Sequence, residues 1–257
     1  FSKAFSGVAG GRGAKRASLY IDRALRELRS VLTREFQNLK GITNVVDLRA
    51  AVADITIMIS KQLREAIEDD VTDAYLNGAR SAFADAPGLG VKSYEQDDYD
   101  LDDIRILQNN GPLGMALGQF ERDLNNEMNK VIFEAAALEV VMSTMVDQVR
   151  AVANTQAWKL GRIARTEMLN VFNEGRFRGY AKAEEILGDR FKYGLQIIND
   201  SRTCGAHQEL SGRIPAGGLF LDELIQLQQS IGASFNMTLT GKALLHPNQR
   251  TVLVMVR

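Results

Sequence analysis

Apolar residues recur at helical spacing over most of the chain, and this pattern restricts the fold more than any other sequence feature. The first such stretch begins near residue 17. Its apolar positions, three and four residues apart, are Leu25, Leu28, Leu32, Phe36 and Leu39. This spacing predicts an amphipathic helix with arginines on its outer face. Residues 45–83 continue the helical pattern without a proline, so the N-terminal part of the chain is predicted to consist of long helices.

Another helical pattern extends from Gln119 toward Leu187. We expect it to break once or twice at a glycine, such as Gly161 or Gly175. Helices of this length without a fixed-period repeat are typical of a bundle or an extended hairpin. The sequence therefore predicts a mainly α fold, in which long helices form a stem or bundle.

A change of composition separates these two helical regions. Residues 84–103 read ADAPGLGVKSYEQDDYDLDD and contain a proline and two glycines. Between Asp85 and Asp103, seven acidic residues accompany a single lysine, Lys92. This composition predicts a solvated acidic linker, which we place at residues 87–116 together with the NNGPLG sequence that ends a short helical segment.

The pattern changes again at residue 191. The runs FKYGLQIIND, residues 191–200, and TVLVMVR, residues 251–257, are rich in β-branched and aromatic residues and are predicted to be strands. Between them lie a glycine-rich connection and a predicted helix at residues 221–232. The helical stem is therefore expected to end in a small C-terminal α+β module with a short β-sheet.

These patterns divide the chain into five parts. The predicted parts are a basic flexible arm at 1–16, an N-terminal helical region at 17–86, the linker at 87–116, a long helical stem at 117–190 and the α+β module at 191–257.

The overall composition excludes several classes of protein. The formal net charge of −1 argues against a uniformly basic nucleic-acid binder, and a single cysteine excludes an internal disulfide framework. The most apolar run, residues 131–146, carries Glu134 and Glu139. It is shorter than the roughly 20 apolar residues that span a bilayer, so no membrane partner is expected.

Positive charge is concentrated near the N-terminus, where residues 1–34 contain eight basic and two acidic residues. Such an arm can bind the phosphates of DNA without reading their sequence. A tail that only increases solubility is the alternative. The candidate DNA-binding residues are Lys3, Arg12, Lys15 and Arg16.

The only cysteine and both histidines lie in the C-terminal module. Cys204 and His207 are three positions apart, and His246 follows in a second segment, which gives three candidate zinc ligands. A fourth ligand would have to come from Asp200, Glu209 or water. The alternative is a small buried thiol, with histidines that form hydrogen bonds to backbone carbonyls.

Other polar residues are placed to hold the module together. Asp200 and Arg202 follow the first predicted strand and Arg250 precedes the last, where bidentate hydrogen bonds would pin the loops. On the preceding helix, four polar residues share one face and either contact solvent or form hydrogen bonds to the module. They are Arg162, Thr166, Asn170 and Asn173.

The order of these motifs resembles the phage head morphogenesis family, the Mu F-like minor head proteins of tailed phages and prophages. That family has a helix starting Arg-Thr-Glu, an Asp-x-Arg-Thr-x-x-x-His-x-x-Leu-x-Gly motif and a closing His-Pro-Asn-Cys-Arg-Cys. Gln249 and Thr251 occupy positions where the family often has cysteines. The matching structural-motif positions are Arg165, Thr166, Glu167, Asp200, Arg202, Thr203, Cys204, His207, Leu210, Gly212, His246, Pro247, Asn248 and Arg250.

The resemblance implies a minor capsid component without an established enzymatic activity or a cofactor. It implies contact with the portal protein, with the major capsid protein or inner capsid surface, and with packaged DNA through the basic arm. The implied location is the interior of the head near the portal vertex, after assembly in the host cytoplasm. The alternative hypothesis is a metal-dependent nuclease or toxin-like effector that uses Cys204, His207 and His246.

Overall fold

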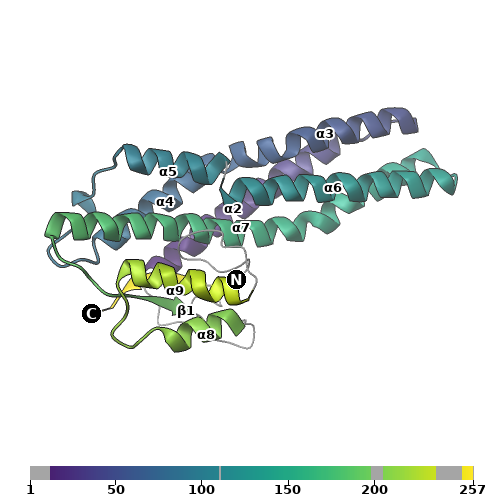
Figure 1. Cartoon of the computed structure of the whole chain (residues 1–257). Helices are drawn as coiled ribbons and strands as arrows, with labels where there is room; N and C mark the ends of the chain where they lie inside the picture. Colours follow the sequence, from purple (N-terminus) through teal and green to yellow (C-terminus); the bar gives the residue numbers. More distant parts are fainter. Residues whose placement is uncertain (1–11, 110, 198–204, 236–250, 257) are drawn as a thin grey trace.

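The computed structural model describes residues 12–109, 111–197, 205–235 and 251–256. It confirms a mainly α fold with a small two-stranded antiparallel sheet near the C-terminus (Figure 1). The helices are α2 (Arg12–Gln37), α3 (Val45–Ala66), α4 (Glu68–Phe83), η1 (Val91–Ser93), α5 (Asp98–Asn109), α6 (Pro112–Ala137), α7 (Met142–Leu187), α8 (Gly205–Arg213) and α9 (Leu221–Ser234). The strands are β1 (Tyr193–Ile197) and β2 (Thr251–Met255).

Four of the helices, α2, α3, α6 and α7, run up and down along a stem (Figure 1). The apolar residues that recur at helical spacing in the sequence form its core, as expected for amphipathic helices. The fully buried members of this core include Leu28, Leu39, Leu48, Ile59 and Leu124. Among the described residues, we find no helix that combines the length and the apolar character needed to cross a membrane.

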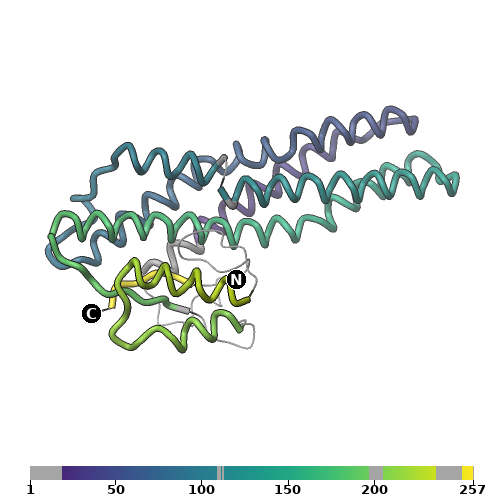
Figure 2. The backbone as a smooth tube through the Cα atoms, in the orientation of Figure 1, coloured from purple at the N-terminus to yellow at the C-terminus, as the bar shows by residue number. Residues whose placement is uncertain are grey.

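The longest described helix, α7, connects the two ends of the molecule (Figure 2). Its 46 residues correspond to a length of about 69 Å. Its N-terminal half belongs to the four-helix stem, while α4 packs along its C-terminal half. The C-terminal module lies against this second half, where α7 contacts β2.

The predicted break of the second helical pattern at Gly161 or Gly175 is wrong, because α7 passes through both glycines. The break lies instead at residues 138–141, between α6 and α7. There the Glu139 N–H donates to the Ala136 carbonyl, and the Val140 N–H donates to the Ala135 carbonyl. This is the hydrogen-bond pattern of a Schellman turn. Its left-handed residue is Glu139, with φ of 53°, so the usual glycine signal for a helix end is missing from the sequence.

Gly175 has a different role, since it lets α4 and α7 approach until their backbones touch. A Cβ atom placed on Gly175 would lie 2.0 Å from the Tyr75 carbonyl oxygen, and one on Gly179 would lie 2.1 Å from that of Ala79. On the facing helix, a Cβ on Gly78 would lie 2.1 Å from the Phe172 carbonyl oxygen. Side chains larger than hydrogen do not fit at these three positions.

Two predicted domain boundaries also need correction. The linker at 87–116 contains all of α5 and the start of α6. Asp97 and Asp100 cap and anchor α5, whereas Glu95, Asp98 and Asp102 are exposed as predicted for a solvated segment. The arm predicted to be flexible up to residue 16 is helical from Arg12, so Arg12, Lys15 and Arg16 lie in the first turns of α2. Lys3 lies outside the described residues.

The C-terminal module follows the prediction closely. The strands β1 and β2 pair antiparallel, with Tyr193 opposite Met255, and α9 covers the helix expected at 221–232. The sequence did not indicate α8, which occupies part of the segment interpreted as a turn and glycine-rich connection. A small core that includes Tyr193, Leu224 and Leu253 joins the module to Phe177 and Tyr180 of α7.

Substitution of Gly175 tests the close packing of α4 and α7. We expect Gly175→Ala to lower the free energy of unfolding by roughly 1–3 kcal/mol or more, because its methyl group would overlap a carbonyl oxygen. Gly161→Ala is the matched control in the same helix. Its Cβ would meet only Leu25 Cδ1 at 3.7 Å, so better helix propensity should stabilise it by up to about 1 kcal/mol. Urea unfolding measures both, and equal effects would contradict the packing role.

Candidate functional site

Polar side chains of α7 supply hydrogen bonds to one edge of β2, while β1 occupies the other edge. Asn173 Nδ2 donates to the Thr251 carbonyl at 2.8 Å, and Asn173 Oδ1 accepts from the Leu253 N–H at 3.1 Å. Arg176 Nε donates to the Leu253 carbonyl at 2.6 Å. If one of these buried groups lost its partner, the free energy of unfolding would fall by roughly 1–3 kcal/mol. The face of α7 therefore takes the place of a third strand.

The charge of Arg176 is balanced within the same junction. Its guanidinium, only 4% exposed, donates through Nη2 to Asp85 Oδ2 at 2.7 Å and through Nη1 to Ser81 Oγ at 3.0 Å. The Tyr180 hydroxyl donates to Asp85 Oδ2 at 2.8 Å and accepts from the Met255 N–H at 3.0 Å. Burial raises the pKa of Tyr180 above its ordinary value, so this hydroxyl keeps the proton that it donates. A buried arginine is tolerated here because each part of it has a partner.

The polar stripe on α7 is thus mostly buried. Thr166, Asn170 and Asn173 are at most 2% exposed, whereas Arg162 is exposed and stacks against Trp158. Of the two interpretations of this stripe, hydrogen bonding to the module is confirmed for Asn173.

Glu167 lies next to this stripe and is 5% exposed. Burial raises its pKa from 4.5 to about 7, although a hydrogen bond of 2.8 Å from Asn170 Nδ2 acts in the opposite direction. Glu167 also lines a crevice of about 110 Å³ between α6 and α7, together with Lys159 and Arg162. The carboxyl group can therefore change its charge near neutral pH inside the stem.

The remaining predicted residues are only partly described. His207 is 4% exposed on α8, Gly212 is exposed near the end of that helix, and Arg165 is half-buried on α7. Burial and the nearby charge of Arg29 lower the pKa of Arg165. Outside the described residues lie Asp200, Arg202, Thr203, Cys204, His246, Pro247, Asn248 and Arg250.

The zinc site and the pinning of loops therefore stay predictions. Two of the three candidate zinc ligands, Cys204 and His246, are outside the described residues. Within the described ranges, no group of three or more His, Cys, Asp and Glu residues is arranged to hold a metal ion.

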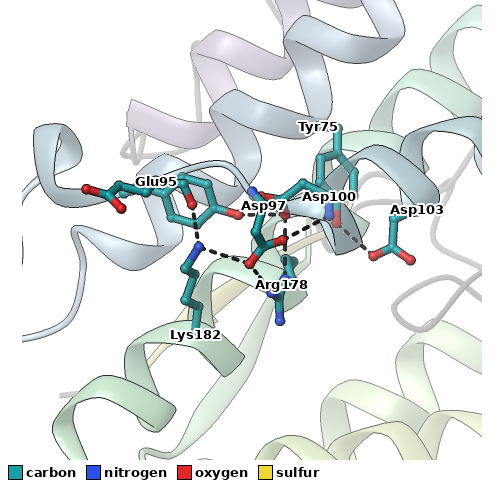
Figure 3. A network of polar contacts seen from close by, with 8 residues as sticks. Tyr75, Glu95, Asp97, Asp100, Asp103, Arg178 and Lys182 are labelled. Carbon is teal, nitrogen blue, oxygen red and sulfur yellow. Dashed lines mark hydrogen bonds and ion pairs between the residues drawn. The ribbon is translucent and has the colours of Figure 1, made fainter.

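A second polar cluster fixes the acidic segment to α7 (Figure 3). Asp97 Oδ2 accepts from Arg178 Nη2 at 2.6 Å and from Lys182 Nζ at 3.1 Å. Burial acts to raise the pKa of Asp97, but hydrogen bonds from Lys182, the Asp100 backbone and Arg178 outweigh it and lower the pKa. Lys182 also donates to the Glu95 carbonyl. Two cations of α7, one turn apart, hold this carboxylate.

The same acidic segment forms its own helix cap. The Asp100 N–H donates to Asp97 Oδ1, and the Asp97 N–H donates to Asp100 Oδ2, both at 3.1 Å. This reciprocal pair satisfies backbone donors at the start of α5, as in a capping box. Asp100 is completely buried, and its Oδ1 accepts from the Tyr94 hydroxyl at 2.7 Å. The Tyr75 hydroxyl of α4 donates to Asp103 Oδ2 at 2.7 Å and adds a further attachment.

Sequence reasoning missed Arg176, Tyr180, Arg178 and Lys182. One local signal for the second cluster was present, because acidic residues three apart at 97 and 100 have the spacing of a helix cap. The partners on α7 are about 80 residues away, and no local pattern indicates them.

Comparison with protein-family models, with curated proteins and with solved structures finds no match. The polar groups of both clusters bind other parts of the same chain. Chemically, this arrangement holds helices and a strand in fixed positions.

The two hydrogen bonds of Asn173 can be tested by truncation. We expect Asn173→Ala to lower the free energy of unfolding by about 2–4 kcal/mol, because the Thr251 carbonyl and the Leu253 N–H lose their partner in a buried place. Amide exchange at Leu253 should become faster. The matched control is Asn129→Ala, which removes an exposed hydrogen bond to the Asn125 carbonyl and should change stability by less than about 0.5 kcal/mol. Unchanged Leu253 protection in Asn173→Ala would refute the edge-pairing role.

Glu167 predicts a pH dependence of stability. Its pKa is higher in the folded than in the unfolded state, so the folded protein holds this proton more tightly between pH 4.5 and about 7. The free energy of unfolding therefore falls as the pH rises through this window, by up to about 3 kcal/mol. Glu167→Gln removes this loss, and its stability gain over the wild type should be near zero at pH 4 and largest above pH 7. Denaturant titrations at several pH values measure it, and a gain that ignores pH would be inconsistent with a buried, titrating carboxyl.

Proposed function

We propose that this chain is a structural interaction protein, the minor head protein of a tailed phage. The family resemblance suggests the biological setting. The residues that carry the resemblance identify the positions at which a structural role can be assessed. Among the described members of that motif, Thr166, Glu167 and His207 are buried, which supports a structural role for these three.

The single observation that carries the proposal is the attachment of the module to α7. Asn173 and Arg176 join the backbone of β2 to a helix that continues, without interruption, to the far end of the stem. A helix of about 69 Å, with the stem on one half and a fixed module on the other, suits a protein that holds two partners at a set separation. A protein that connects two partners needs binding surfaces more than a catalytic cavity.

In this proposal one partner is the portal protein, and the other is the major capsid protein or the inner capsid surface. The protein would act inside the head near the portal vertex, after assembly in the host cytoplasm. Contact with packaged DNA rests on the sequence alone. Of its four candidate residues, Arg12, Lys15 and Arg16 lie in the first turns of α2.

Co-purification with the portal protein of the same phage tests the proposal. We expect the full chain and the portal to co-elute in size-exclusion chromatography at micromolar concentration. A chain without residues 1–11, which precede α2, should bind the portal equally well, because the stem and module are intact. Asn129→Ala serves as a folded surface control. Separate elution of the wild-type chain and the portal at all salt concentrations would exclude this function.

A further inference from the structure

Residues of α6, of α7 and of the turn between them line a groove. Figure 1 shows this turn at the distal end of the stem. The volume of the groove is about 400 Å³. Its lining is mainly apolar and includes Val131 and Ala135 from α6 and Ala151 and Val152 from α7. The α7 residues that line it, 148–156, come well before Asn173 and Arg176, which contact β2.

The spacing of the lining residues fits a third helix. On α6 they lie at positions 127, 131, 134 and 135, followed by Leu138 directly after its last residue, and on α7 they lie at 148, 151, 152, 155 and 156. Both sets recur every three or four residues, so each helix presents one continuous stripe to the groove. Two such stripes side by side form the groove that receives the apolar face of an amphipathic helix. From Glu127 on α6 to its C-cap Leu138, this side of the groove is about 16 Å long, which matches three helical turns.

The charges at the rim define the kind of helix that fits. Glu127 and Glu134 are both exposed and line the groove on the α6 side. Among the described residues that line it, none is basic. A partner with lysines or arginines beside its apolar stripe complements this rim. Such charge pairs contribute more to specificity and association rate than to affinity.

The distal turn leaves further apolar surface at the end of the groove. Leu138 is 77% exposed and Val141 is 66% exposed. Exposed apolar side chains gathered at one place are a feature of a surface that a partner covers.

We propose that this groove binds a basic, amphipathic helix of about three turns from a partner protein. The inference rests on the proposed function, because it assigns the distal end of the stem to one of the two partners that the chain would join. It does not depend on which of the two supplies the helix.

The probes are two fluorescein-labelled synthetic helices of equal length, one built from lysine and leucine and the other from glutamate and leucine. Fluorescence anisotropy should show saturable binding of the basic peptide with an affinity at least about tenfold higher than that of the acidic one. Glu127→Lys with Glu134→Lys should reverse this preference. If the wild-type chain binds neither peptide, or binds both equally, the inference is overturned.

A matched pair of variants locates the binding. Ala151→Arg places a large cation in the groove at an exposed position, whereas Ala136→Arg adds the same charge at an exposed position of α6 outside the lining. Binding of the basic peptide should weaken about tenfold or more in the first variant and by less than about twofold in the second. Equal loss in both would mean a general charge effect and would overturn the groove as the site.

The same variants, added to the portal co-purification, separate this inference from the proposed function. Loss of portal binding in Ala151→Arg but not in Ala136→Arg supports both the groove and the proposed function. Portal binding that survives in Ala151→Arg, together with peptide binding that also survives, overturns the groove and leaves the proposed function standing. Peptide binding by a wild-type chain that ignores the portal overturns the proposed function and leaves the groove standing. Self-association that Ala151→Arg abolishes would identify a second copy as the occupant and overturn the partner helix.

Discussion

Direct contact between the backbones of α4 and α7 determines the rest of this structure. The glycines at 78, 175 and 179 remove the side chains that would keep the two helices apart. Only at this short separation do Asp85 and Ser81, from the end of α4 and the residues after it, reach Arg176. With its charge balanced in this way, Arg176 can be buried and can donate to β2. The close packing of α4 and α7 therefore allows the C-terminal module to attach to α7 without leaving a buried charge unpaired.

The sequence predicts the elements that depend on local periodicity and misses those that depend on distant partners. Apolar spacing identified the stem helices, and β-branched runs identified β1 and β2. The same local view treated Gly175 as a helix break, although a backbone 100 residues earlier occupies the space beside it. It also placed Asp97 and Asp100 in solvent. Their partners, Arg178 and Lys182, lie in another part of the chain, so no local pattern indicates these contacts.

The sequence predicted only part of the candidate site, because local spacing again gives no information on distant partners. Helical spacing placed Thr166, Asn170 and Asn173 on one face, and the poor fit of short polar side chains to a helix interior suggested a polar partner. Spacing alone could not choose between solvent and β2. Arg176 and Tyr180 complete the face, but an arginine and a tyrosine on a helix carry no sign that they will be buried. That choice depends on the approach of α4, which lies outside any local window.

The hydrogen bonds between α7 and β2 also determine where the specificity of this junction is encoded. Each hydrogen bond that Asn173, Arg176 or Tyr180 forms with β2 involves a main-chain atom of the strand. Many extended sequences could offer the same carbonyls and N–H groups, whereas few side chains could replace the three on the helix. These bonds therefore restrict the sequence of the strand less than that of the helix, although buried positions such as Val252 and Leu253 must stay apolar to pack. Distant relatives of this junction should be sought first by the polar face of the helix, and only then by the apolar strand that it holds.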